Sequence, residues 1–152
     1  MIPRQVAELL QTGVSVIIGT RNAALMPECT RAWGIRVTAD GKATVFLAET
    51  ISQRTLENLR DNGLIAISCT RPTDHVACQL KGRVRSIRPA SAADRDAARQ
   101  WHREFIGEII AIGVPAELCE AWIAEPTVAV EVDVTDVFEQ TPGPGAGEKL
   151  RS

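Results

Sequence analysis

With 152 residues, the chain has the length of one domain that can bury a core without disulfides or metals, so we expect residues 1–152 to form a single domain. The 17 Lys and Arg residues against 19 Asp and Glu residues leave a formal charge of −2, which excludes the strongly basic surface of a nucleic-acid-binding domain. No apolar run approaches the ~20 residues of a membrane span, and the N-terminal MIPRQVAELLQTG lacks the cleavage site of a signal peptide, so we expect a cytoplasmic protein without membrane or nucleic-acid partners.

The first third of the chain has the pattern of one short helix followed by strands. Apolar residues alternate with smaller or polar ones from Val14 to Ile18, which is typical of a half-buried strand. The Asp40-Gly41 dipeptide is a strong signal for a hairpin turn between two further strands. The pattern therefore predicts, in chain order, a helix over residues 3–10 and strands over 14–18, 28–38 and 44–48.

The remaining elements alternate between helices and strands. They are, in chain order, a short helix within 49–63, strands over 64–70 and 75–87, a long helix over 90–112, a short helix after Pro115 and a last strand from Val128. Six strands with mostly hairpin connections predict an α+β fold, built on a six-stranded antiparallel barrel with peripheral helices. The glycine-rich tail at 143–152 lacks the strand, the helix and the Gly-Lys-Ser/Thr ending of a nucleotide-binding loop.

The faces of the two helices that follow residue 90 can also be predicted. Ser91 and Asp94 suit the start of the long helix, where a small polar residue caps and an acid favours the dipole. His102 lies beside the apolar stripe of this helix, which favours a structural or exposed histidine over a catalytic one. The stripe consists of Ala98, Trp101, Phe105, Ile109 and Ile112, and in the next helix Leu118, Trp122 and Ile123 are expected to face inward.

Several kinds of chemistry have no counterpart in the sequence. The four cysteines, Cys29, Cys69, Cys78 and Cys119, show no CxxC spacing, so we expect reduced and mostly buried thiols and no metal site. No segment resembles a nucleophile elbow, and no loop gathers the paired carboxylates of an acid–base catalyst. Binding of an anion is the chemistry that remains.

The stretch ETISQRTLENLRDNG (49–63) gathers polar and basic groups where a strand leads into a helix. Arg54 and Thr55 open that helix, where unpaired backbone N–H groups and the helix dipole attract negative charge. Arg31, early in the second predicted strand, is expected to lie near the same helix start. An equally weighted alternative is that Ser52 only caps the helix and that the arginines pair with surface acids.

The order of elements, together with three segments, resembles the pyridoxamine 5'-phosphate oxidase-like split barrels that bind flavin mononucleotide (FMN). The segments are TRAWGIRV (30–37), VFLAETISQRTLENLRDNG (45–63) and the strand Val76–Arg85. The resemblance covers nearly the whole chain and implies a split β-barrel that forms a homodimer with flavins at the subunit interface.

The resemblance also implies roles for particular residues. It places a cofactor site at Thr30, Arg31 and Ala32 in the first segment and at Ser52, Gln53, Arg54 and Thr55 in the second. Arg36 corresponds to a substrate-binding lysine of the vitamin-processing members. The expected cofactor is FMN, with a deazaflavin as an accepted variant in related barrels, and the expected activity is that of a flavin-dependent oxidoreductase of unknown substrate.

True pyridoxamine 5'-phosphate oxidase activity is not expected. The C-terminal FEQTPGPGAGEKL lacks the arginine and histidine that grip the substrate phosphate in those enzymes, and the chain contains no Tyr. The alternative to an enzyme is a non-enzymatic protein of the same fold that binds a flavin, a deazaflavin or haem.

Overall fold

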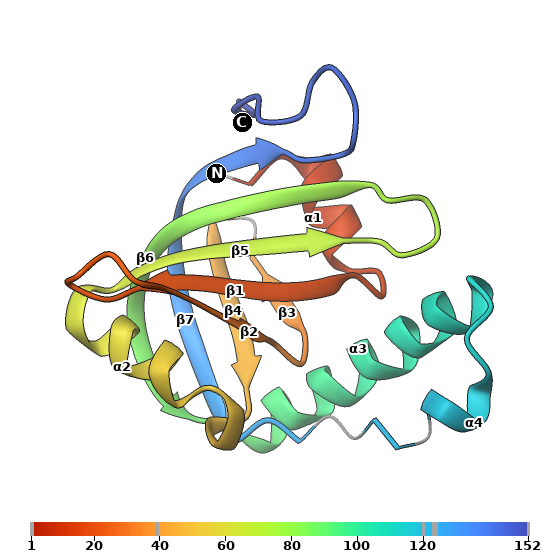
Figure 1. The fold of residues 1–152 in the computed structure, drawn as a ribbon, viewed down its shortest axis with the longest axis horizontal. Coiled ribbons are helices and arrows are strands. Elements are labelled where there is room, and N and C mark those ends of the chain that lie inside the picture. Colours follow the sequence, from red (N-terminus) through yellow and green to blue (C-terminus); the bar gives the residue numbers. More distant parts are fainter. Residues whose placement is uncertain (1, 39, 120, 123–124, 152) are drawn as a thin grey trace.

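A computed structural model describes residues 2–38, 40–119, 121–122 and 125–151 (Figure 1). The elements are, in chain order, α1 (Arg4–Leu10), β1 (Ser15–Arg21), β2 (Pro27–Arg31), β3 (Ile35–Val37), β4 (Lys42–Leu47), the 3-10 helix η1 (Glu49–Ile51), α2 (Gln53–Asn62), β5 (Leu64–Thr70), β6 (Ala77–Pro89), α3 (Ala92–Ala111), α4 (Ala116–Cys119) and β7 (Val128–Glu139).

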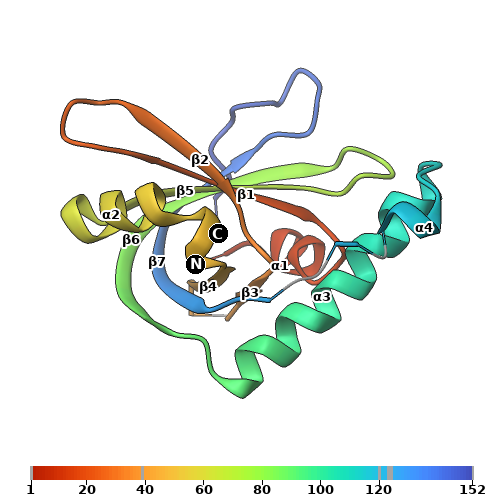
Figure 2. The same ribbon diagram turned by 60° about the horizontal axis from the view of Figure 1, so that its bottom comes forward.

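The strands form one curled antiparallel sheet in the order β2-β1-β5-β6-β7-β4-β3. The long strands β6 and β7 bend through the sheet, so that β4 and β3 lie across from β1 and β2 and the sheet closes into a half-barrel (Figures 1 and 2). The predicted α+β fold with an antiparallel split barrel and peripheral helices is confirmed. The number of described strands is seven, however, and not the six that the sequence predicted.

The extra strand arises because the predicted strand over 28–38 is broken at Ala32–Gly34. Up to Arg31 the segment pairs with β1, and from Ile35 it pairs with β4 at the opposite edge of the sheet. The Trp33 N–H donates to the Phe46 carbonyl (2.7 Å) across the break. Gly34 has φ +112, and a Cβ there would lie 3.0 Å from Trp101 Cγ, so the turn requires glycine.

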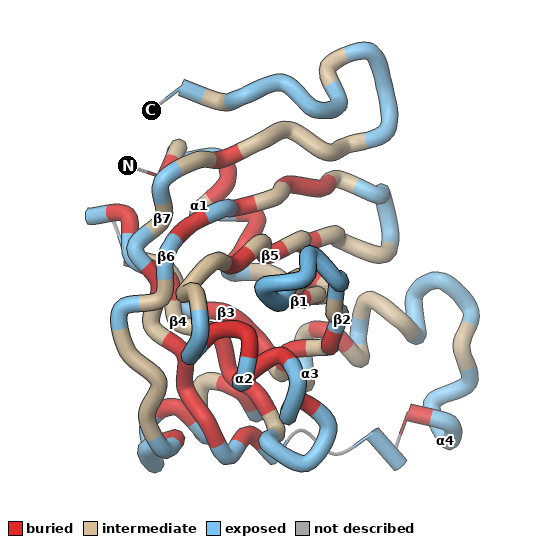
Figure 3. The backbone as a smooth tube through the Cα atoms, turned by 60° about the vertical axis from the view of Figure 1, so that its left-hand side comes forward, coloured by how far each residue is buried: buried red, intermediate tan, exposed pale blue. Residues whose placement is uncertain are grey.

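The core lies inside the curl of the sheet, and α1 and α3 cover part of it. Alternate residues of β1 and β5 are fully or almost fully buried, and burial is concentrated on the strands that surround the interior (Figure 3). Trp101 is buried, and its indole N–H donates to the Val14 carbonyl (2.8 Å). A Cβ at Gly13 would lie 2.4 Å from the Glu104 backbone, so this glycine lets the chain before β1 pass close to α3.

The predicted stripe of α3 is buried only in its first part. Trp101 and Phe105 are buried together with Ala98, whereas Ile112 is 52% exposed, so the prediction for Ile112 is wrong. Leu118 and Trp122 are also exposed, at 63% and 43%, because α4 has a single turn that packs little of its surface. Ile123, which was expected to face inward with them, lies outside the described residues.

The start of α3 is held by a buried carboxylate. The Asp94 side chain is 1% exposed and accepts from the Ser91 N–H (2.9 Å), while the Ser91 hydroxyl accepts from the Asp94 N–H (3.2 Å), which completes a capping box. Arg88 and Arg36 both donate to the same carboxylate, and Arg88 also donates to Glu131. The hydrogen bond from Arg88 is the largest cause that holds the pKa of Asp94 well below its usual range.

The C-terminal segment does not extend freely from the sheet. The Gly147 N–H donates to the Glu139 carbonyl (2.7 Å), and the Leu150 N–H donates to the Val137 carbonyl (2.8 Å). These bonds fold the glycine-rich segment back onto the end of β7 (Figure 1). Among the helices that the structure describes, none has the length and apolar content to cross a bilayer.

Candidate functional site

Three of the hydroxyl groups that the sequence singled out meet at the start of α2. The Thr30 hydroxyl lies 3.3 Å from both the Ile51 carbonyl and the Ser52 hydroxyl. Ser52 occupies the N-cap position but its side chain makes no cap hydrogen bond, so the interpretation of Ser52 as a capping side chain is wrong. The Thr55 hydroxyl is buried and has no partner among the described residues, which leaves a donor unused beside the helix start.

Arg54 and Gln53 are exposed in the first turn of the same helix. The first turn contains no acidic residue, and Arg54 forms no ion pair with any described carboxylate. A cation at a helix N-terminus opposes the dipole and brings no stability by itself. The position therefore suits an arginine that binds an external anion.

Arg31 lies on the opposite face of β2 from Thr30, because successive side chains of a strand alternate. Its guanidinium lies 5.6 Å from the centre of the Phe105 ring, and its Nη1 donates a long hydrogen bond to Ser15 Oγ (3.4 Å). No described carboxylate pairs with it. The structure thus brings the Thr30 and Ser52 hydroxyls together, leaves the Thr55 hydroxyl without a described partner in the first turn of α2, and directs the Arg31 side chain to the other side of the strand.

The backbone of β2 at Arg31 is open to a ligand. β2 is an edge strand, and the Ala32 N–H donates to the Val16 carbonyl of β1 (3.0 Å). Because N–H groups alternate in direction along an antiparallel strand, the Arg31 N–H points away from β1. Arg31 therefore offers a main-chain donor at the edge and a guanidinium without a described carboxylate partner, while Ala32 is buried and bonded to the sheet.

Arg36 has a structural partner in the folded chain. Its Nη2 donates to Asp94 (3.0 Å), and its guanidinium lies 5.6 Å from the centre of the Phe46 ring. The side chain is 43% exposed, so part of it still faces solvent. Substrate binding by Arg36 stays a prediction, and the contact that the structure records is with the start of α3.

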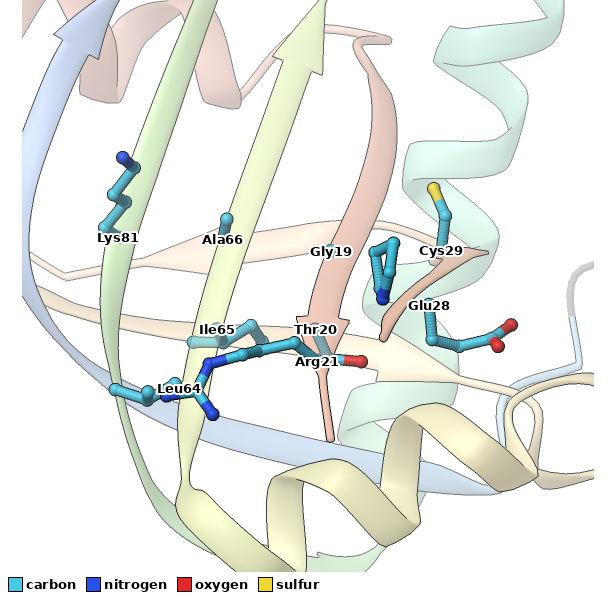
Figure 4. A pocket seen from close by; sticks show the side chains of 10 residues that line it. Gly19, Thr20, Arg21, Glu28, Cys29, Leu64, Ile65, Ala66 and Lys81 are labelled. Carbon is cyan, nitrogen blue, oxygen red and sulfur yellow. The ribbon is translucent and has the colours of Figure 1, made fainter. Parts of the chain in front are cut away.

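A hollow of about 650 Å³ lies on the solvent-accessible face of β1, β5 and β6, which we call the open face (Figure 4). Most of its strand residues alternate with the buried ones, although the buried Thr20 and Ile65 also belong to its lining. The strand register places one row across it, with Cys29 paired to Gly19, Gly19 to Ala66 and Ala66 to Lys81. Figure 4 shows Lys81 and Cys29 at the two ends of this row, with only Ala66 and Gly19 between them.

Sequence reasoning missed this hollow, although one signal for it was present. An isolated glycine within a strand often marks a site where a ligand or another backbone approaches closely. Gly19 is such a residue, in the middle of the well-patterned β1. Arg21 and Leu64 lie in the next row of the same face, and Glu28 also lines the hollow, so the floor of small residues is bordered by basic, acidic and apolar side chains.

A second, smaller hollow has a volume of about 340 Å³, and its lining is largely aromatic. Arg31 belongs to its lining, which otherwise comes from the break after β2, from α3 and from the segment after α4. Two buried ring nitrogens of lining residues, Trp33 Nε1 and His102 Nε2, find no hydrogen-bond partner in the described part of the chain. The lining residues are Arg31, Trp33, His102, Phe105, Ala121 and Trp122.

No arrangement suited to a structural or catalytic metal accompanies these hollows. Within the described ranges, no three or more His, Cys, Asp or Glu side chains are grouped so that they could hold a metal ion.

No protein-family model and no curated protein matches the sequence. Solved structures do match the fold. An F420 reductase aligns over 90% of this chain and 98% of its own, with a TM-score of 0.61 and 13% identity. A pyridoxamine 5'-phosphate oxidase-like protein from Lactobacillus delbrueckii aligns over 90% of this chain and 93% of its own, with a TM-score of 0.58 and 11% identity. The haem storage protein HutZ from Vibrio cholerae aligns over 89% of this chain and 92% of its own, with a TM-score of 0.51 and 15% identity.

These structures are split barrels of the pyridoxamine 5'-phosphate oxidase-like kind, and the chain has their fold. The resemblance inferred from the sequence is confirmed at the level of the fold. The names of the matched proteins refer to F420 in one case and to haem in another, so the fold alone does not choose the ligand.

Proposed function

We propose that the protein binds FMN, or a deazaflavin, on the open face and acts as a flavin-dependent oxidoreductase. The observation that carries this proposal is the glycine at position 19. Its φ lies outside the left-handed region, and a Cβ there would meet no atom closer than 3.9 Å, so neither the backbone nor the packing of the chain requires glycine. A flat molecule that lies against the sheet does require it, because any side chain would fill its place.

The residues around this floor suit the charge and size of a flavin. Lys81 and Arg21 line the hollow, and the main-chain N–H of Arg31 lies at the outer edge of the neighbouring strand β2. Arg54, at the start of α2, supplies a further cation near the β2 edge for a phosphate group. The volume of about 650 Å³ falls in the ordinary range for cofactor pockets, about 300–1,000 Å³. The bound flavin would supply the hydride chemistry.

The proposal includes a cytoplasmic homodimer. The strands β2 and β3 are the two edges of the sheet, and the open face leaves several half-exposed side chains beside the hollow. A second copy on this face would cover them and would enclose the flavin between two chains. Substrate-binding groups, with Arg36 as a candidate, would then come from both copies.

Substitution of Arg54 tests the phosphate side of this site. We expect Arg54→Ala to weaken FMN binding by about tenfold or more, because one charge-assisted hydrogen bond to the phosphate is lost. The matched control is Arg60→Ala, which removes an exposed arginine from the last turn of the same helix. The dissociation constants are measured by titration of the flavin-free protein with FMN. Equal affinity in the wild type and Arg54→Ala would show that Arg54 is only a surface residue.

The second candidate is a non-enzymatic protein that binds haem. It is favoured by His102, whose Nε2 has no hydrogen-bond partner among the described residues, since a neutral imidazole is a common ligand of haem iron. Haem is larger than the adjoining hollow of about 340 Å³ and would have to extend out of it. The absorption spectrum after addition of haem or of FMN separates the two candidates. A Soret band that His102→Ala abolishes supports haem binding, whereas flavin bands that persist in His102→Ala support the first proposal.

A further inference from the structure

The smaller hollow brings together three segments that are distant in the sequence. Arg31 and Trp33 come from the chain at the end of β2, His102 and Phe105 from the middle of α3, and Trp122 from the segment after α4. Its volume of about 340 Å³ lies at the lower end of the range for small-molecule sites. The size suits a compound of one or two rings and is small for a flavin with its tail.

The walls of this hollow are aromatic and nearly parallel. The Phe105 and Trp122 rings stack with centroids 6.3 Å apart at 20°, and Trp101 stacks on the other side of Phe105 at 5.1 Å and 8°. Trp122 is 43% exposed although it is a large apolar side chain. A wall of stacked rings that ends in an exposed tryptophan suits a planar aromatic ligand, which would extend the stack.

The polar groups around the walls are mainly donors. The Arg31 guanidinium lies 5.6 Å from the centre of the Phe105 ring and pairs with no carboxylate in the described chain. Trp33 Nε1 can only donate, and it is buried without an acceptor among the residues that the structure describes. A buried donor without a partner is destabilising, so an acceptor delivered by a ligand or a water molecule would be stabilised here.

We propose that this hollow is a second ligand site, separate from the open face, and that it binds a small aromatic carboxylate. The ring of the ligand would stack on the exposed Trp122 at the end of the aromatic stack, and its carboxylate would accept hydrogen bonds from Arg31. Trp33 lies in the same lining and offers a further donor. Cationic aromatics and neutral aliphatic compounds do not match this combination of stacked rings and unpaired cation. The proposal does not depend on the bound flavin, and the two hollows share no lining residue.

The test is calorimetric titration of the protein with 2-naphthoate. We expect saturable binding with one 2-naphthoate per chain. Two analogues separate the contributions: 2-naphthylmethanol retains the rings without the charge, and cyclohexanecarboxylate retains the charge without the aromatic rings. Each is expected to bind at least about tenfold more weakly. Absence of saturable binding, or equal affinity for 2-naphthoate and 2-naphthylmethanol, would overturn the proposal.

Variants assign the binding to this hollow. Trp33→Phe retains a ring and removes the donor, and we expect its affinity for 2-naphthoate to fall about threefold to tenfold. Arg31→Gln removes the cation, and we expect its affinity for 2-naphthoate to fall by about tenfold or more. Arg99→Gln, an exposed arginine of α3 that pairs with Asp96, is the matched control and should bind as the wild type does. Thermal unfolding of each variant verifies the fold, and Trp33→Phe carries the test if Arg31→Gln is unstable. Unchanged affinity in a folded Trp33→Phe and Arg31→Gln would place the ligand elsewhere.

A parallel titration with FMN separates this proposal from the preceding one. We expect 2-naphthoate to bind protein that is already saturated with FMN. Displacement of 2-naphthoate by FMN would mean a single shared site and would overturn the proposal of a second one. Binding of FMN without any binding of 2-naphthoate would leave the flavin proposal intact and refute this one.

Discussion

Asp94→Asn is expected to lower the free energy of unfolding by about 2–3 kcal/mol near neutral pH. The Asp94 side chain is 1% exposed and receives hydrogen bonds from Arg36 and Arg88 as well as from Ser91. Removal of one partner from a fully buried ion pair costs about 3–5 kcal/mol. We reduce this figure because the Arg36 and Arg88 side chains are 43% and 34% exposed, so water screens part of the interaction.

The same carboxylate predicts how stability depends on pH. The pKa of Asp94 in the folded chain lies well below its usual range, chiefly through the hydrogen bond from Arg88. Its contribution to stability is therefore fully present above the unfolded pKa of about 3.9 and is lost as the pH falls toward the lower folded pKa. The wild type should lose stability below about pH 4 more steeply than Asp94→Asn does.

Urea unfolding of both proteins at several pH values measures this difference. Asp96→Asn is the matched control, because Asp96 lies on the same helix but is 71% exposed and pairs only with Arg99. We expect Asp96→Asn to change stability by less than about 1 kcal/mol. If Asp94→Asn were as stable as Asp96→Asn, the network at the start of α3 would not hold the fold as described.

Gly19→Val is expected to abolish flavin binding, with a loss of at least about a hundredfold in affinity, and to leave the fold intact. The valine would stand in the middle of the row from Cys29 to Lys81, where the proposed flavin would lie. The strand itself has room for it, since a Cβ at Gly19 would only reach ordinary contact with Ala66 at 3.9 Å. Valine also favours strand conformation more than glycine does.

Titration of flavin-free Gly19→Val with FMN, together with thermal unfolding, checks this expectation. Gly107→Ala is the control, because a Cβ at Gly107 meets no other atom within 4 Å and the residue lies on α3, away from the open face. A stable Gly19→Val that binds FMN as tightly as Gly107→Ala would remove the open face as the flavin site.

Much of the fold could be predicted from local patterns. The alternation of buried and half-buried residues in β1 and β5 follows directly from the sequence, as do the capping box of Ser91 and Asp94 and the glycine end of α2 at Gly63. The break at Ala32–Gly34 could not, because it depends on contacts with Phe46 and Trp101 that lie far along the chain. A continuous pattern of strand-forming residues does not reveal where a chain crosses between two edges of a sheet.

The candidate site was only partly predictable for the same physical reason. The cluster of Thr30, Ser52 and Thr55 could be inferred from the polar segment before α2. The partner of Arg36 is Asp94, 58 residues away, and such a pair carries no local signal. The row of Cys29, Gly19, Ala66 and Lys81 exists only through the register of four strands, so no linear motif contains it.

Binding of a flavin on the open face can be tested on the purified protein. Occupancy is measured by the visible absorption spectrum, by mass spectrometry of the released ligand and by titration of the ligand-free chain with FMN. We expect flavin absorption bands and saturation at one FMN per chain. A colourless protein that takes up no FMN or deazaflavin on reconstitution would contradict this expectation.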